Sequence, residues 1–150
     1  MRKPEESRQA KPPVAQIKSK KRVKDFAEVF TNEREVKAMC DLIPAETWEN
    51  IASTFLEPAC GNGNFLVEIM ARKYSYCQSP TEGIIALSSV VGIDIQPDNC
   101  EECRARLFGQ YKDAFQDACE IYTRLAEAVL ARNIICGNSL EIMKRWSEGG

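Results

Sequence analysis

The sequence contains no histidine among its 150 residues. This absence removes the usual general base and the commonest metal ligand of proteins. Long apolar runs are also missing, because the longest uncharged stretch, residues 83–93, is far shorter than the roughly 20 residues that a membrane-spanning helix needs. No apolar signal core follows the basic N-terminus. We therefore expect a cytoplasmic protein whose chemistry uses neither histidine nor a membrane segment.

Seven cysteines are spread along the chain, an odd number for a disulfide framework. Without a secretion signal they are expected to be reduced thiols. Cys100 and Cys103 form a C-x-x-C pair, but one pair without histidine or a second pair at zinc-ribbon spacing is weak evidence for a metal. Both sulfurs fit the apolar stripe of a helix, so we expect no metal site.

Charge is divided unevenly along the chain. The first 24 residues carry nine Lys or Arg against two Glu, with three prolines, whereas the whole chain has a net charge of −2. This composition predicts a basic disordered tail over residues 1–24 that either solubilises the protein or contacts DNA. Residues 25–150 are acidic overall and ordinary in composition, which predicts one globular domain.

Helical and strand patterns alternate after the tail. The first helix is predicted to begin at the cap residue Asn32, with Glu35 as its third residue, and to stop at Pro44. The remaining patterns predict three strands, over 54–58, 90–95 and 133–136. A short helix over 45–53 precedes the first strand, and a helix after a glycine turn and a helix over 80–89 follow it. Between the second and third strands we expect a helix from Pro97 and a longer helix with apolar residues from 115 to 129.

This β-α-β-α-β order predicts an α/β fold with a doubly wound parallel sheet. Such folds bind their ligands at the carboxyl ends of the strands. We expect the sheet to be truncated after its third strand, which leaves residues 133–136 as an exposed edge. An exposed edge makes self-association plausible.

Residues 54–66, TFLEPACGNGNFL, are the most informative stretch. After a short apolar strand, Gly61 and Gly63 permit a tight turn with positive φ, and Asn62 or Asn64 can cap the helix that follows. The same geometry serves dinucleotides, phosphates and S-adenosylmethionine (SAM). The third glycine of the G-x-G-x-x-G fingerprint is missing, which disfavours a nicotinamide dinucleotide but leaves it open.

Polar residues stand at the ends of all three predicted strands. Asp94 can accept hydrogen bonds from ribose hydroxyls, or it can cap the next helix. Asn138 can form hydrogen bonds with the edge of a purine, or it can be a turn residue. Glu57 can bind the ammonium of an amino acid, or it can accept hydrogen bonds from backbone amides.

Residues 57–65, E-P-A-C-G-N-G-N-F, resemble the SAM-binding motif of amino-group DNA methyltransferases, especially the adenine-N6 enzymes of bacterial restriction-modification systems. Upstream, residues 28–31 (EVFT) are similar to the family segment that closes over the methionine moiety, although Asn32 replaces the usual proline. Downstream, residues 92–95 (GIDI) resemble the ribose-binding strand end. Residues 136–140 (CGNSL) resemble the adenine-edge segment, which usually reads Gly-Asp.

The resemblance covers most of the chain, residues 21–143. It implies a Rossmann-like SAM-dependent methyltransferase fold and a transferase that acts in DNA methylation. Asp94 would hold the ribose, Ile95 would pack on the adenine face and Asn138 would bond the adenine amino group. The cofactor-binding residues that it implies are Phe30, Thr31, Glu57, Pro58, Ala59, Gly61, Gly63, Asn64, Phe65, Asp94, Ile95, Asn138 and Ser139.

The catalytic motif of these enzymes is absent from the 150 residues. They flip the target adenine out of the duplex and hold it with Asn or Asp, two prolines and an aromatic residue. The only adjacent prolines, Pro12 and Pro13, lie in the basic tail. We therefore expect no catalytic residue here, and DNA contact only through parts outside this chain or through the tail. A stand-alone SAM-binding or interaction module, or a nucleotide-binding Rossmann protein, are the alternatives.

Overall fold

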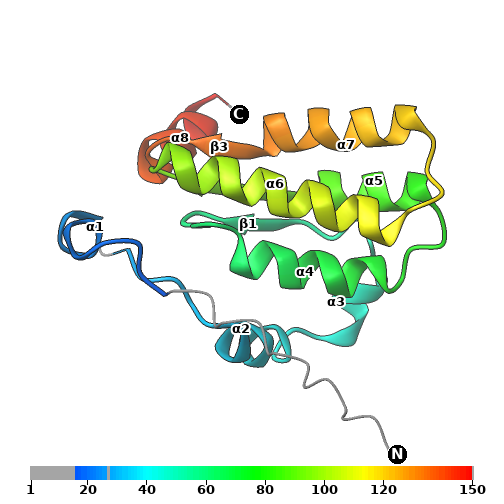
Figure 1. The fold of residues 1–150 in the computed structure, drawn as a ribbon, viewed down its shortest axis with the longest axis horizontal. Coiled ribbons are helices and arrows are strands. Elements are labelled where there is room, and N and C mark those ends of the chain that lie inside the picture. The colour runs from blue at the N-terminus through cyan, green and yellow to red at the C-terminus, as the bar shows by residue number, and fades with distance from the viewer. Residues whose placement is uncertain (1–15, 27, 150) are drawn as a thin grey trace, which may run out of the picture.

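The chain folds around a small parallel sheet (Figure 1). The structure is a computed structural model that describes residues 16–26 and 28–149. Within these residues the strands β1 (Phe55–Glu57), β2 (Val90–Asp94) and β3 (Ile134–Cys136) pair in the order β1-β2-β3, all parallel. The α/β class and the parallel sheet, which the alternation of patterns predicts, are confirmed.

Two helices connect each strand to the next. α4 and α5 link β1 to β2, and α6 and α7 link β2 to β3, while α4 and α6 pack beside each other. The helices of the described residues are α1 (Lys20–Phe26), α2 (Glu33–Cys40), α3 (Ala45–Glu49), α4 (Asn64–Tyr74), α5 (Pro80–Ser88), α6 (Pro97–Ala114), α7 (Glu120–Asn133) and α8 (Ser139–Glu148). None of these helices is both long enough and apolar enough to cross a membrane.

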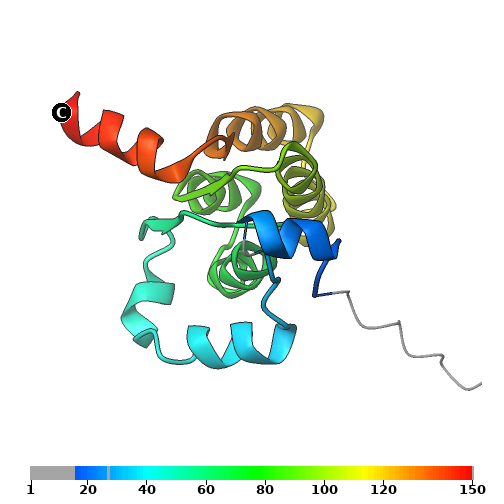
Figure 2. The same cartoon turned by 90° about the vertical axis from the view of Figure 1, so that its left-hand side faces the viewer.

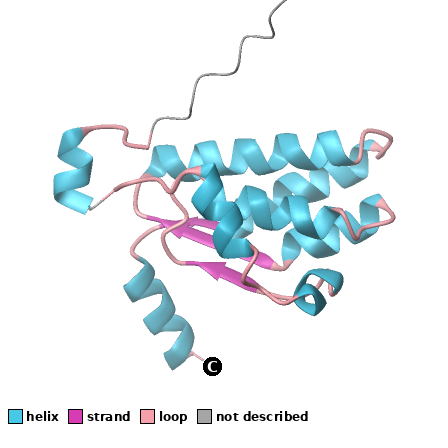
Figure 3. Ribbon diagram, turned by 90° about the horizontal axis from the view of Figure 1, so that it is seen from below, coloured by secondary structure: helices cyan, strands magenta, loops and turns pink. Residues whose placement is uncertain are grey.

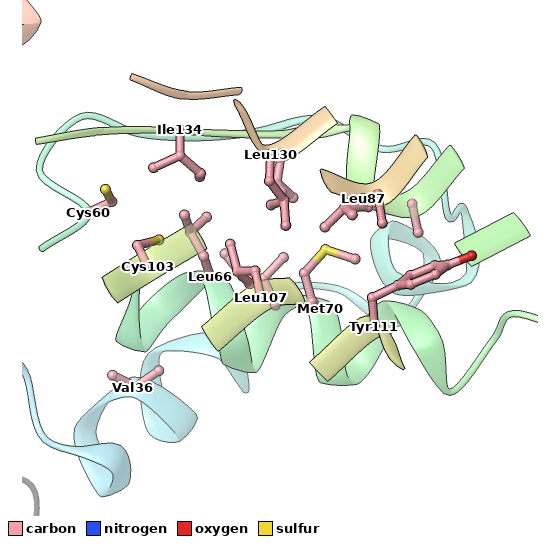
Figure 4. Packing of buried hydrophobic residues seen from close by; sticks show 14 of the residues in the cluster. Val36, Cys60, Leu66, Met70, Leu87, Cys103, Leu107, Tyr111, Leu130 and Ile134 are labelled. Carbon is pink, nitrogen blue, oxygen red and sulfur yellow. The ribbon is translucent and has the colours of Figure 1, made fainter. Parts of the chain in front are cut away.

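The core is formed mainly by the sheet and the helices α4, α5, α6 and α7 (Figure 4). Leu66 and Met70 of α4, Leu107 of α6 and Ile134 of β3 are fully buried there. Gly92 of β2 faces the same core, where a Cβ would lie 2.7 Å from Leu66 Cδ1. The glycine therefore lets α4 approach the sheet closely.

The C-x-x-C pair belongs to this core. Cys100 and Cys103 are fully buried on one side of α6, as the helical stripe predicts. In the described part of the chain no group of three or more His, Cys, Asp or Glu side chains is placed to hold a metal ion.

The structure confirms the predicted N-cap of one helix and contradicts that of another. Asn32 Oδ1 accepts the Glu35 N–H at 3.0 Å, which confirms the predicted cap of α2. The predicted cap of α4 at Asn62 or Asn64 is wrong, because Gly63 occupies that position with a φ of 97°. Asn64 is instead the first residue of α4.

Several predicted boundaries also differ. The short helix expected over 45–53 ends at Glu49. The helix that begins at Pro97 runs to Ala114, and the next begins only at Glu120. The chain turns between them where the Phe115 ring packs against Tyr74 and Tyr111, with ring centroids 5.2 and 5.0 Å apart.

The third strand begins one residue later than expected. Asn133 ends α7, and its Nδ2 donates to the carbonyls of Ser88 and Val90 at 3.2 and 3.0 Å. These bonds tie the end of α7 to the start of β2. β3 then lies at an edge of the sheet, as predicted, and β1 forms the other edge.

Part of the basic tail contacts the globular domain. Residues 1–15 lie outside the described residues, but Lys18 Nζ and Arg22 Nη1 lie 2.9 and 2.7 Å from Asp98 Oδ2 on α6. Hydrogen bonds from Arg22 and then from Lys18 hold the pKa of Asp98 well below its usual range. The composition of residues 16–24 did not indicate this attachment, which depends on a carboxylate distant in sequence.

α8 follows β3 and was not predicted. It runs away from the other helices (Figures 2 and 3), and Ile142 is its buried residue. Its Leu140 and Trp146 are exposed, as is Leu56 on β1, whose side chain is 46% exposed. Because parallel sheets in proteins are normally covered on both faces, this apolar surface favours association.

We therefore expect the isolated chain to self-associate in a concentration-dependent way. Sedimentation equilibrium should show a dimer, and Leu56→Lys should weaken it because the substitution places a charge on the exposed side of β1. Leu42→Lys, at a position that is 83% exposed in the turn after α2, serves as the control and should change nothing. A wild-type chain that stays monomeric at high concentration would contradict this expectation.

A buried lysine joins α4 to the segment before β1. Lys73 is fully buried, and its Nζ donates to the carbonyls of Ile51 and Ser53 at 2.9 and 2.5 Å. Burial lowers the pKa of Lys73 to about 8. The side chain satisfies two carbonyls of an irregular segment, although its charge is costly to bury.

Lys73→Met should destabilise the fold by about 1–3 kcal/mol, because the two carbonyls lose their donor. The cost should grow with pH. Between the folded pKa of about 8 and the ordinary value of 10.5, the unfolded chain binds more protons at this residue than the folded chain. The stabilising contribution of Lys73 therefore rises across that window. Urea unfolding of both proteins below, within and above the window measures it; a constant difference would contradict the assignment.

Candidate functional site

A cavity of about 340 Å³ opens at the carboxyl end of the sheet. Four segments that are far apart in sequence line it. They are residues 28–31 before α2, residues 58–65 without Gly63 between β1 and α4, residues 94–95 after β2, and residues 137–140 after β3. This is the place where a parallel α/β sheet presents its ligand site.

Most of the residues expected at a cofactor site line this cavity. Glu57 and Gly63 are the two that do not. The expected residues that do line it are Phe30, Thr31, Pro58, Ala59, Gly61, Asn64, Phe65, Asp94, Ile95, Asn138 and Ser139.

The turn between β1 and α4 requires glycine at two positions. Gly61 has a φ of 53°, and a Cβ there would lie 2.9 Å from the Phe30 ring. Gly63 has a φ of 97°, and its Cβ would lie 2.8 Å from Cys103 Sγ. Side chains rarely adopt these φ values, and neither position has room for one. Gly63 thus shapes the turn from behind, whereas Gly61 faces the cavity.

Asp94 holds this turn against the end of β2. Its Oδ1 accepts the Gly61 N–H at 3.2 Å, and its Oδ2 accepts the Gln96 N–H at 3.0 Å and Asn99 Nδ2 at 2.9 Å. The bond from Gln96 closes a turn before α6, but Asp94 does not cap that helix, because Gln96 is its N-cap and no side chain caps it. The expected helix-cap role of Asp94 is therefore wrong. A carboxylate has about four acceptor positions, so the three bonds leave room for one ligand hydroxyl.

The segment before α2 covers the glycine turn. Phe30 is buried against Gly61, and Asn64 Nδ2 donates to the Thr31 carbonyl at 2.8 Å. Glu28 Oε2 accepts Arg22 Nη2 at 2.8 Å and Asn99 Nδ2 at 2.7 Å. Asn99 therefore links this segment to the carboxylate of Asp94.

Glu57 lies beside the cavity rather than in its lining. Its Oε1 accepts the Ala59 N–H at 3.3 Å. Acceptance of a backbone amide was one of the two roles expected for Glu57. Burial raises the pKa of the Glu57 carboxyl, and the Ala59 hydrogen bond partly opposes that shift.

Asn138 and Ile95 stand on the far rim. Asn138 is the N-cap of α8, and its Oδ1 accepts the Glu141 N–H at 3.2 Å. This agrees with the structural alternative, a turn residue, that the sequence allowed for Asn138. Its amide still has two donor hydrogens and a second lone pair. Ile95 lines the cavity and is 45% exposed. Its side chain therefore offers an apolar surface to a ligand.

The lining favours a ligand that donates hydrogen bonds. Its charged residues are two carboxylates, Glu28 and Asp94, and no Lys or Arg of the described residues lines it. Glu28 Oε1 and Asn62 Oδ1 are buried and accept no hydrogen bond from the described part of the chain. Ammonium, hydroxyl and amino groups would match these acceptors, whereas a phosphate would be repelled by the carboxylates.

Sequence reasoning missed several lining residues. Those absent from the expected set are Glu28, Val29, Cys60, Asn62, Gly137 and Leu140. All six lie within the segments that resemble the family, next to residues that were expected to bind the cofactor. Leu140 ends the segment 136–140 and is 77% exposed on α8, a helix that the sequence pattern did not predict.

A larger hollow of about 860 Å³ lies between α2 and α4. Its polar groups are partly satisfied by one another, since Lys37 lies 2.8 Å from Glu33 and Arg106 donates to Asn64 Oδ1 at 2.8 Å. The smaller cavity has the glycine turn, the strand ends and the unpaired acceptors, so we assign the site there.

Comparison of the chain with protein-family models, with curated proteins and with solved structures finds no match.

Proposed function

We propose that the chain is the SAM-binding portion of a site-specific DNA methyltransferase that transfers a methyl group to adenine N6 in a restriction-modification system. The parallel sheet would then be part of a Rossmann-like methyltransferase fold. The observation that supports this proposal is the convergence of the four motif-like segments on one cavity. Residues 28–31, 58–65, 94–95 and 137–140 resemble the family in sequence and in order. The last three segments follow β1, β2 and β3, so the parallel sheet brings them together, whereas residues 28–31 reach the cavity from outside the sheet.

Each part of SAM has a chemically matched group in the lining. The apolar surface of Ile95 suits the adenine face, and the remaining acceptor position of Asp94 suits a ribose hydroxyl. The turn at Gly61 suits the methionine part, because it lines the cavity together with Phe30, whose ring packs directly against it. The carboxylates would also offset the positive charges of the sulfonium and the ammonium.

The chemistry of methyl transfer lies outside these residues in our proposal. The bound cofactor would supply the methyl group, and the described residues would bind and orient it. The target base would be held by an Asn-Pro-Pro-aromatic motif that the 150 residues do not contain. Contact with DNA would use other parts of the enzyme or the basic tail. A cytoplasmic location agrees with such a role.

A non-catalytic SAM-binding or interaction module is the second candidate. Such a module would not need an Asn-Pro-Pro-aromatic motif. A nucleotide-binding Rossmann protein is a third, weaker candidate, because two carboxylates in the lining oppose a phosphate. Binding of SAM would separate the first two candidates from the third, and the coding sequence beyond residue 150 would separate the first two.

We expect isothermal titration calorimetry to detect binding of S-adenosylhomocysteine, and Ile95→Ala to weaken it by about tenfold, since covering that side chain contributes on the order of 1.4 kcal/mol. Ile85→Ala is a matched control, because Ile85 of α5 is 43% exposed and Ile95 is 45% exposed. Equal affinities of the two variants would contradict the assignment of the adenine surface.

Asp94→Asn should weaken the same binding by about 10- to 100-fold, because hydrogen bonds to a charged acceptor contribute roughly 1.5–3 kcal/mol. Asp117→Asn, in the exposed turn between α6 and α7, should leave the affinity unchanged. Circular dichroism confirms that both variants fold. A folded Asp94→Asn variant with wild-type affinity would remove Asp94 from the site.

The isolated chain should transfer no methyl group to DNA. Incubation with labelled SAM and adenine-containing duplex DNA is expected to give no incorporation above a boiled control, because the base-holding motif is missing. Incorporation that is lost in Asp94→Asn would show that the described residues suffice for catalysis.

A further inference from the structure

Two cysteines on different elements lie close to the cavity, although neither is part of its lining. Cys100 lies in the first turn of α6, and Cys136 is the last residue of β3. Cys136 immediately precedes the lining residues 137–140, and Cys100 immediately follows Asn99, whose side chain donates to Asp94. Both cysteines are therefore adjacent in sequence to groups that form or support the site.

The backbone places the two side chains together. Cys100 Sγ lies 3.5 Å from the Asp94 carbonyl oxygen and 3.7 Å from the Ile135 carbonyl oxygen, between β2 and β3. Asp94 is the register partner of Cys136 in the neighbouring strand. Ile134 points into the core beside α6 (Figure 4), and side chains two residues apart in a strand share a face. Cys136 thus projects to the side of the sheet where Cys100 lies.

The two thiols differ in accessibility. Cys136 is exposed, whereas Cys100 is fully buried. Burial, together with the neighbouring Cys136, raises the pKa of the Cys100 thiol to about 12. A reagent in solution therefore reacts first with Cys136. Cys100 is accessible only to a group on Cys136.

The other cysteines lack this combination of an exposed and a buried partner. Cys60 and Cys103 lie together beneath the glycine turn, but both are buried. Cys119 is exposed, and it precedes α7 at the other end of the parallel strands from the cavity.

We propose that Cys136 and Cys100 form a reversible disulfide on reaction with a hydroperoxide. The Cys136 thiolate attacks one peroxide oxygen, the O–O bond breaks, and the leaving oxygen takes up a proton. Cys136 then carries a sulfenic acid. The Cys100 sulfur attacks the Cys136 sulfur, the S–S bond forms and the S–O bond breaks. The departing hydroxide leaves as water with the Cys100 proton. Two thiols are oxidised by two electrons, and the peroxide is reduced.

The bond would act directly on the rim of the site. It would join the turn that carries Asn99 to the loop that carries Asn138, both of which position lining groups. Oxidation would then fix the spacing between the ends of β2 and β3, which a dithiol reductant would release.

The test uses the whole chain and hydrogen peroxide. After remaining thiols are alkylated, tryptic peptides are analysed without reduction, and fragmentation assigns the linked sulfurs. The expected product links Cys100 to Cys136 and disappears after treatment with dithiothreitol. Cys136→Ser should abolish it, whereas Cys119→Ser, the matched exposed control, should retain it in full.

Because the position of Cys136 is exposed, the Cys136→Ser variant should unfold at the same temperature as the wild type. Loss of the disulfide in that variant then results from the missing thiol and not from misfolding. A Cys60 to Cys103 link, only intermolecular links, or terminal oxidation of Cys136 with Cys100 still reduced would each overturn the proposal. The experiment needs no cofactor, so its failure would leave the proposed function untouched.

Discussion

The carboxylate of Asp94 is the interaction on which the rest of the site depends. It binds the Gly61 amide of the glycine turn, the Gln96 amide at the start of α6, and the side chain of Asn99. Through Asn99 it also reaches Glu28 in the segment before α2. Charge-assisted hydrogen bonds such as these, which are partly buried, are stronger than neutral ones. One side chain thus joins the ends of two strands, one helix and the covering segment.

The parallel sheet makes this convergence possible. Each crossover returns the chain in the same direction, so β1, β2 and β3 all end on the side where the cavity opens. Gly92 lets α4 pack under the sheet, which brings the glycine turn to the end of β2. The ionic contacts of Lys18 and Arg22 with Asp98 then bring the covering segment to the same place. Core packing and surface charge therefore act together on one cavity.

Much of the architecture was predictable from local patterns, and most of the cavity from the motifs. The Asn32 cap, the buried stripe of α6 and the parallel strands follow from short-range rules of spacing and capping. The failures have long-range causes. Phe115 ends a helix through an aromatic cluster, and Lys18 finds a carboxylate 80 residues away. The structural role of Asp94, which accepts hydrogen bonds from Gly61, Gln96 and Asn99, likewise required its three-dimensional neighbours.

Nuclear magnetic resonance of the 15N-labelled chain, titrated with S-adenosylhomocysteine, locates the bound ligand and does not rely on activity. Binding in the cavity should give the largest amide shifts at Gly61, Ile95 and Asn138, which line it from three separate segments. Unchanged spectra at saturating ligand, or shifts confined to the hollow around Lys37 and Asp41, would contradict it.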